Sequence, residues 1–214
     1  MNCRRLSAGI MLAGTVLVSC PTEGAQIDLP NLVVRIYMTS AAHARDWKTS
    51  IAEATAILDD AGIDVDWINC SETVVPIRCA LPLKLNEVAV RIVRGPASGH
   101  HHDTLGDSLL DPVRRIGTLA TIYLDRVEWL AAAGGVDAGI VLARAIAHEL
   151  GHLVLGTTAH SRRGLMRPVW SRDELIRARA ADWRFPAEDA TRLQQALGRR
   201  LETTPEAVVV WNTQ

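Results

Sequence analysis

Residues 137–155 constrain the fold of this chain more than any other segment. They are apolar nearly all round, which is typical of a helix buried in the core of a domain. Gly134 and Gly135 precede the segment, Asp137 can cap its first turn, and Gly156 can adopt the left-handed conformation that ends a helix. The sequence therefore predicts a buried helix here, around which the rest of the domain must pack.

This helix carries the pattern H-E-x-x-H, in which His148 and His152 are four residues apart. Four residues are slightly more than one helical turn, so both imidazoles leave the same face and can hold one zinc ion. Buried histidines and a buried glutamate would each carry a desolvation cost without partners, and a metal removes that cost. Glu149 projects beside the two rings, where its carboxylate can take a proton from a metal-bound water. The pattern predicts one zinc ion per chain and a general base.

Three neighbouring residues bear on this metal site. His160 is a candidate third ligand, and Met166 follows it in a candidate methionine turn. Three protein ligands would leave the fourth position of tetrahedral zinc open to water, which is the arrangement of a hydrolase. Arg144 lies one turn before His148, where a cation would disfavour a metal. We therefore expect Arg144 to bond a carboxylate or to point away.

The run from His148 to Met166 resembles the metzincin clan of zinc peptidases, and its matrixin and adamalysin relatives in particular. That clan's signature is H-E-x-x-H-x-x-G-x-x-H followed by a methionine turn. The stretch from His148 to Trp170 is also similar to a group of uncharacterised bacterial exported proteins. The resemblance implies a zinc-dependent metalloendopeptidase with Glu149 as its catalytic residue, His148, His152 and His160 as metal ligands, and Met166 packed beneath the metal. It also implies an α/β (α+β) zincin-like domain, with a twisted mixed sheet, an active-site helix and a C-terminal helix.

The spacing in this chain departs from that signature. The glycine falls four residues after His152 instead of three, and His160 falls eight residues after it instead of six. The helix would run one residue longer, and the identity of the third ligand stays open. Glu174, with its neighbour Asp173, lies near the distance at which thermolysin-like gluzincins place a glutamate ligand. A zinc-stabilised exported binding module without turnover is a further alternative.

The remaining elements are expected in an order that suits one domain, residues 26–214. Strands are expected at 32–39, 63–68, 88–93 and 118–124, and helices at 45–61 and 186–201. The long segment 95–117 contains three adjacent histidines at 100–102. We place substrate contacts in this segment, because an extended peptide can add to the edge of a sheet beside the active helix.

The first 25 residues are expected to be a signal peptide. Arg4 and Arg5 form a positive region, and residues 7–19 form an apolar stretch too short to span a bilayer comfortably. Cys20 ends a run that resembles a bacterial lipobox, and cleavage nearer Ala25 is the alternative. The sequence thus predicts an exported protein that is periplasmic, secreted or lipid-anchored at the cell envelope.

The net charge bears on the partner of this protein, and the cysteine content agrees with export. The net charge of −1 gives no indication of nucleic-acid binding, so the expected partner is a peptide or protein substrate. A membrane would be contacted only through a lipid anchor at Cys20. Cys70 and Cys79 remain outside the leader, and in an oxidising compartment they are expected to form a disulfide.

Overall fold

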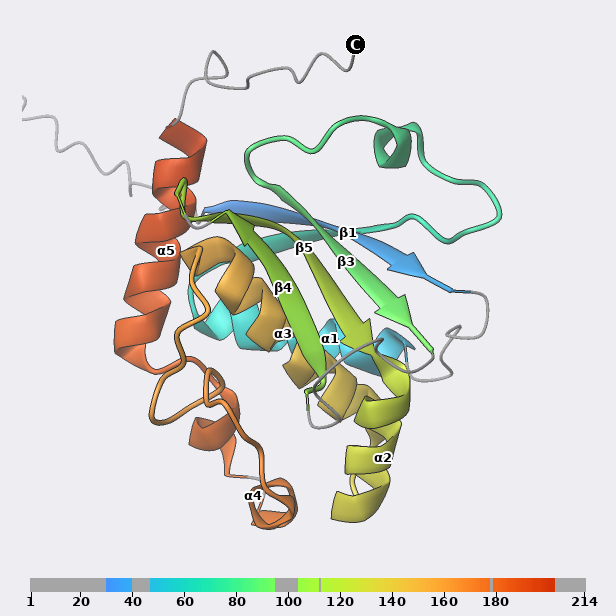
Figure 1. The fold of residues 1–214 in the computed structure, drawn as a ribbon, viewed down its shortest axis with the longest axis vertical. Helices are drawn as coiled ribbons and strands as arrows, with labels where there is room; N and C mark the ends of the chain where they lie inside the picture. Colours follow the sequence, from blue (N-terminus) through green and yellow to red (C-terminus); the bar gives the residue numbers. More distant parts are fainter. Residues whose placement is uncertain (1–29, 40–46, 95–103, 112, 178, 203–214) are drawn as a thin grey trace, which may run out of the picture.

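The computed structural model describes residues 30–39, 47–94, 104–111, 113–177 and 179–202 (Figure 1). The predicted signal peptide with Cys20 and the histidines at 100–102 lie outside these residues. One mixed sheet has the strand order β2-β1-β3-β5-β4. Its strands are β1 (Asn31–Met38), β2 (Asp64–Asn69), β3 (Glu87–Val93), β4 (Gly106–Asp111) and β5 (Ile116–Tyr123). Only β4 runs antiparallel to its neighbour, so the predicted mixed sheet is confirmed.

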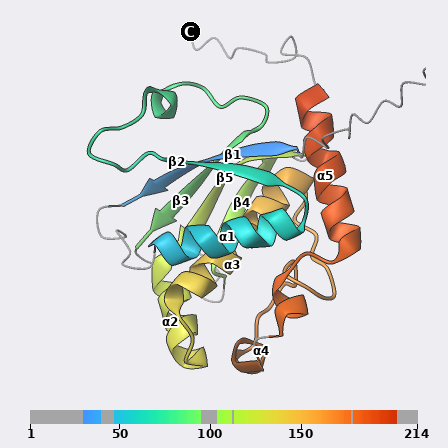
Figure 2. The same cartoon turned by 180° about the vertical axis from the view of Figure 1, so that it is seen from behind.

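Helices cover one face of this sheet. The helices are α1 (Trp47–Asp60), α2 (Leu124–Gly134), α3 (Ala138–Leu155), α4 (Arg172–Arg177) and α5 (Ala187–Glu202), with 3-10 turns η2 (Ile77–Ala80) and η3 (Ala180–Trp183). Helices α1 and α3 lie side by side beneath the strands, and α5 stands at one end of the sheet (Figures 1 and 2). Fully buried side chains from both layers, such as Val34, Ile36, Ile57, Ile146 and Leu150, form the core between them.

Helix α3 begins and ends where the sequence predicts. The Asp137 side chain accepts a hydrogen bond from the backbone N–H of Ile140 at 3.1 Å and so caps the first turn. Gly156 has a φ of +60°, and a Cβ there would lie 1.8 Å from the carbonyl oxygen of Arg115. Only glycine fits this end of the helix. Although α3 is long and apolar enough to cross a membrane, 89% of it is buried inside the domain, so it is a core helix.

Two elements differ from the sequence-based expectation. Strand β4 lies within the segment 95–117, where no strand was expected, and its side chains are partly buried or exposed. Helix α2 begins at Leu124, directly after Tyr123 ends β5. No helix was expected between this strand and the active helix, so the expected order of elements was wrong at this point. No glycine or proline separates β5 from α2, so the change from strand to helix has no local marker in the sequence.

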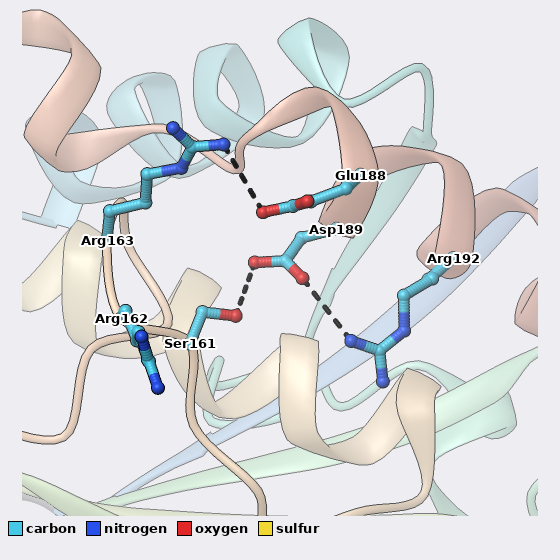
Figure 3. A pocket seen from close by; sticks show the side chains of 6 residues that line it. All are labelled: Ser161, Arg162, Arg163, Glu188, Asp189 and Arg192. Atoms are coloured by element: carbon cyan, nitrogen blue, oxygen red, sulfur yellow. Dashed lines mark hydrogen bonds and ion pairs between the residues drawn. The ribbon is translucent and has the colours of Figure 1, made fainter.

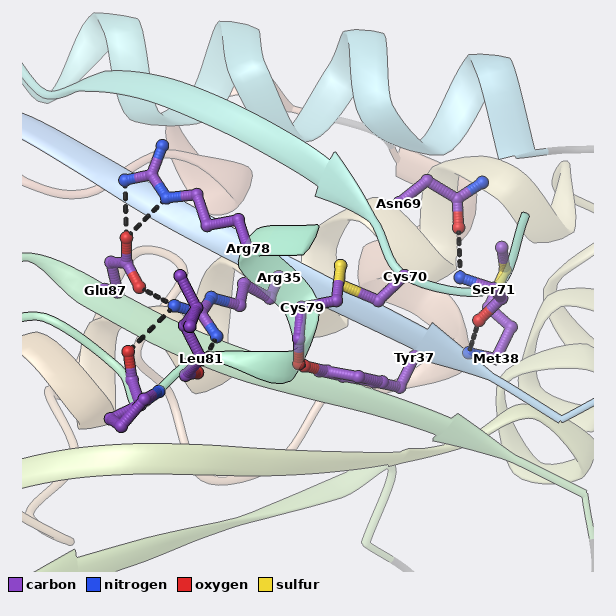
Figure 4. The surroundings of a disulfide bond; sticks show 11 residues. Arg35, Tyr37, Met38, Asn69, Cys70, Ser71, Arg78, Cys79, Leu81 and Glu87 are labelled. Atoms are coloured by element: carbon purple, nitrogen blue, oxygen red, sulfur yellow. Dashed lines mark hydrogen bonds and ion pairs between the residues drawn. A yellow bond between two sulfur atoms is a disulfide. The ribbon is translucent and has the colours of Figure 1, made fainter. Parts of the chain in front are cut away.

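The other face of the sheet is partly covered by the segment between β2 and β3. This segment contains the disulfide between Cys70 and Cys79, the pair expected from the sequence (Figure 4). Side chains alternate along β1, so Arg35 and Tyr37 point away from the face that packs on α1 and α3. Tyr37 donates a hydrogen bond to the carbonyl oxygen of Cys79 at 3.1 Å, and Arg35 donates to the carbonyl of Pro82 at 3.1 Å. These bonds hold the segment against the sheet.

A buried ion group lies under this segment. Glu87 is fully buried, Arg35 is 1% exposed, and the carboxylate of Glu87 is paired with both Arg35 and Arg78 (Figure 4). Burial alone would raise the pKa of the Glu87 carboxyl. Hydrogen bonds from the Lys84 backbone N–H and from the two arginines outweigh burial, and the pKa lies below its ordinary value. Glu87 is therefore a carboxylate that the folded state keeps charged.

Candidate metal centre

The three predicted histidines come together at one end of the active helix. His148 and His152 project from the same face of α3, and their Nε2 atoms lie 3.0 Å apart. His160 lies on the loop that returns after Gly156, and its ring contacts the rings of both helical histidines. The three candidate ligand nitrogens all lie within 4.8 Å of one another.

Backbone carbonyls fix the orientation of the two helical rings. The Nδ1 atom of His148 lies 2.9 Å from the carbonyl oxygen of Leu165, and Nδ1 of His152 lies 2.7 Å from that of Thr157. A carbonyl oxygen only accepts, so each Nδ1 must carry the proton. The unprotonated Nε2 atoms then direct their lone pairs at each other across 3.0 Å. Such an arrangement is unfavourable unless a cation lies between them, and these residues therefore fit a metal ion.

The protonation state of the three rings also suits a metal. Burial lowers the pKa of His148 to about 3, despite the hydrogen bond to Leu165. Burial likewise lowers the pKa of His152 and of His160 below their ordinary values. All three imidazoles are therefore neutral at neutral pH, and the neutral ring is the form that binds a metal. Nitrogen ligands of this kind suit zinc, and three of them match a catalytic zinc site.

Met166 packs directly against the active helix. It is 1% exposed, and its sulfur would lie 2.6 Å from a Cβ placed on Gly151. The glycine inside the H-E-x-x-H pattern therefore makes room for this methionine. The carbonyl of neighbouring Leu165 is the one that faces His148. The predicted methionine turn thus packs against the part of α3 that carries the two histidines.

Glu149 faces the edge of the sheet. Its side chain is buried, and the hydroxyl of Ser108 on β4 donates a hydrogen bond to its Oε2 at 2.7 Å. Burial raises the pKa of Glu149 to about 7; the Ser108 bond lowers it, and the charge of Asp107 raises it. Ser108 was not among the site residues expected from the sequence. One serine in a segment without a clear strand pattern gives no signal for this contact.

The alternative third ligands, Glu174 and Asp173, lie outside the histidine cluster. Glu174 is paired with Arg167, and its Oε2 accepts hydrogen bonds from both the backbone N–H and the hydroxyl of Ser171 at 2.8 Å. This is a capping box at the start of α4. Asp173 is exposed on the first turn of the same helix. In the described part of the chain, neither carboxylate joins the histidine cluster.

Arg144 packs against an aromatic ring and, among the residues that the structure describes, forms no ion pair with a carboxylate. Its guanidinium lies over the ring of Trp183, 4.1 Å from the ring centre. Burial lowers the pKa of Arg144 to about 10, and its Nε and Nη1 atoms have no hydrogen-bond partner among the described residues. The aromatic face stabilises the cation, and the charge of Glu53 also favours it by raising the pKa of Arg144.

Comparisons with known proteins show the fold. No protein-family model matches the sequence, and no curated protein matches it. The structure is similar to archaemetzincin from Methanopyrus kandleri, with a TM-score of 0.53 and 13% identity over 79% of this chain and 97% of that one. A zinc-dependent peptidase from Methanocorpusculum labreanum gives a TM-score of 0.45 and 17% identity over 75% of this chain and 99% of the other. The fold is thus archaemetzincin-like; the narrower resemblance to matrixins and adamalysins stays a prediction.

Proposed function

We propose that this chain is a zinc-dependent metalloendopeptidase. The observation that carries the proposal is the pair of helical imidazoles, whose Nδ1 atoms are held by carbonyls and whose Nε2 atoms converge. His148, His152 and His160 would hold one zinc ion per chain. Zinc at such a site polarises a carbonyl and makes water nucleophilic near neutral pH. The archaemetzincin-like fold supports the same proposal.

The protein's own residues supply the remaining chemistry. Glu149 would accept a proton from the attacking water and deliver it to the leaving amine. Burial raises the pKa of this carboxyl above its ordinary value, which suits a group that first accepts and then donates a proton. A purely structural site needs no such base, and this favours catalysis over a binding module without turnover. Met166 would support the site from below without a bond to the metal.

The substrate would lie along β4. This strand is at the end of the described sheet, and its residue Ser108 touches Glu149. An extended peptide can add to such an edge through backbone hydrogen bonds, which brings a peptide bond beside the general base. A peptide that runs along a strand can continue past both ends of the site. We therefore propose endopeptidase activity on peptides or proteins.

Export is part of the proposal. A signal peptide over residues 1–25 would direct the chain out of the cytoplasm, with Cys20 as a possible lipid anchor and residues 26–214 as the peptidase domain. The disulfide between Cys70 and Cys79 supports an oxidising compartment. Fractionation of the native host, with detection of the protein in envelope and medium, tests this part independently of activity.

The activity itself is tested with a mixed peptide library. We expect the purified protein to cleave internal peptide bonds, to lose this activity on treatment with a zinc chelator, and to regain it when zinc is added back. Bound zinc without any cleavage would favour the binding module. Cleavage that survives complete removal of the metal would contradict the proposal.

Ser108→Ala is expected to lower kcat by about tenfold, the effect of losing one hydrogen bond of about 1.4 kcal/mol to a charged group. The substitution removes the Ser108 hydroxyl, so the Glu149 carboxylate loses its hydrogen bond to β4. Zinc content should stay unchanged, because Ser108 does not touch the histidines. Ser108→Thr keeps a hydroxyl and is the matched control. Equal kcat values for wild type and Ser108→Ala would refute this role.

A further inference from the structure

The third ligand is held differently from the other two. Helix α3 and two carbonyls fix the rings of His148 and His152. His160 lies on an exposed loop, and in the described part of the chain no hydrogen bond holds its ring. Its position must therefore be set by the backbone around it. Whatever anchors that backbone determines whether the third nitrogen stays near the other two.

The residue that follows His160 carries this anchor. The backbone N–H of Ser161 donates to the carbonyl oxygen of Met166 at 2.8 Å, which closes the loop onto the methionine turn. The Ser161 hydroxyl donates to Oδ2 of Asp189 at 2.6 Å (Figure 3). Asp189 lies in the first turn of α5 and is only 2% exposed. One residue thus connects the third ligand to both the turn and the C-terminal helix.

Helix α5 is a rigid base for this contact. Leu193 and Leu197 on its inner face are buried in the core. Farther along the helix, the guanidinium of Arg200 donates to the carbonyl oxygens of Leu153 at 3.3 Å and Gly117 at 3.2 Å. The helix is thereby fixed to the last turn of α3, which also carries His152. The three ligands then belong to one connected unit.

We propose that Asp189 is a positioning residue for the metal site, acting through Ser161 on His160. The inference rests on the proposed zinc site. It gives the C-terminal helix a role in metal affinity. The sequence alone does not suggest this role, because the helix lies far from the H-E-x-x-H pattern along the chain. The bond is charge-assisted, since a buried carboxylate accepts from a hydroxyl, and such bonds are stronger than neutral ones.

Asp189 also has a second role that must be separated from this one. A carboxylate in the first turn of a helix stabilises that helix, and Asp189 is paired with Arg192 at 3.5 Å (Figure 3). Changing Asp189 would disturb both roles. Ser161→Ala removes only the bond to the ligand loop and leaves the aspartate in its helix. Arg192→Ala removes the other partner, so it is the matched control.

The test is zinc affinity, measured by competition with a chromophoric chelator on the full-length protein. We expect Ser161→Ala to weaken zinc binding about 10- to 100-fold, the usual effect of losing a group that orients a ligand. Ser161→Thr should restore the affinity, and Arg192→Ala should leave it unchanged. The melting temperature of each metal-free variant, and the visible spectrum of its cobalt form, are recorded alongside.

The outcomes separate this inference from the proposed function. Weaker zinc binding by Ser161→Ala, with an altered cobalt spectrum and an unchanged metal-free melting temperature, supports the positioning role. Equal zinc affinity in wild type and Ser161→Ala overturns the inference and leaves the zinc site intact. A lower melting temperature with unchanged affinity also overturns it, since the bond is then merely structural. A wild-type protein that binds no zinc overturns the proposed function, and this inference with it.

Discussion

Glu149→Gln is expected to lower kcat/KM for peptide cleavage by about 10²- to 10⁴-fold, the usual contribution of a general base. The amide keeps the size of the side chain and can still accept the Ser108 hydrogen bond, but it cannot take a proton from water. The zinc content should not change, because the rings of His148 and His152 are held by the carbonyls of Leu165 and Thr157 and not by Glu149. Activity and bound zinc are measured on the same preparation.

The comparison of these two measurements decides the role of Glu149. Loss of activity with zinc retained assigns proton transfer to this carboxyl. Loss of both would mean that Glu149 supports the metal site instead of the chemistry. Activity close to that of the wild type would show that another group acts as the base, and the catalytic role proposed for Glu149 would be wrong.

Glu87→Gln is expected to reduce the free energy of unfolding at neutral pH by about 3 kcal/mol. The substitution leaves the guanidinium of Arg35, which is 1% exposed, without its compensating charge. Removing one partner of a buried pair costs more than removing both, because an unpaired charge remains in the interior. Urea unfolding monitored by tryptophan fluorescence measures the effect.

Two comparisons test this explanation of Glu87. The double variant Arg35→Met, Glu87→Leu should lose less stability than Glu87→Gln, since Arg78 is partly exposed and can reach water. The pKa of Glu87 is lower in the folded state than its ordinary value of 4.5. Its carboxylate thus stabilises the fold above that pH, and this contribution is lost as the pH falls through the folded pKa. The gap between wild type and Glu87→Gln should therefore narrow in acid; a constant gap would contradict the ionic explanation.

The parts of the fold that could be predicted are those with a local chemical marker. Asp137 and Gly156 mark the two ends of α3. The first turn needs a capping side chain and the last turn needs a left-handed residue, and both needs depend only on nearby residues. The start of helix α2 and strand β4 have no comparable marker, although Gly135 in the left-handed conformation does mark the C-terminal end of α2. Strand β4 forms an antiparallel pair with β5 across a short connection, but its own residues lack the regular alternation of apolar and polar side chains that would predict a strand. The burial of Arg35 likewise depends on the segment that the disulfide closes over it.

The candidate site divides in the same way. The spacing of His148 and His152 follows from the helical period, so their common face could be predicted from the sequence. His160 could be preferred as third ligand because Met166 follows it, but Glu174 stayed an alternative, because a shifted spacing fits more than one loop path. The structure places His160 in the cluster and uses Glu174 as a helix cap. The contacts of Ser108 and Asp189 join distant segments and have no signal in a single sequence.

Zinc content is the most direct test of the central proposal. Wild type, His160→Ala and Glu174→Ala are purified in parallel, dialysed against the same zinc buffer and analysed for metal per chain. We expect about one zinc per chain in wild type and in Glu174→Ala, and loss of zinc in His160→Ala, as for a site with three protein ligands. Zinc that persists in His160→Ala and disappears in Glu174→Ala, or a wild type without zinc, would contradict the three-histidine site.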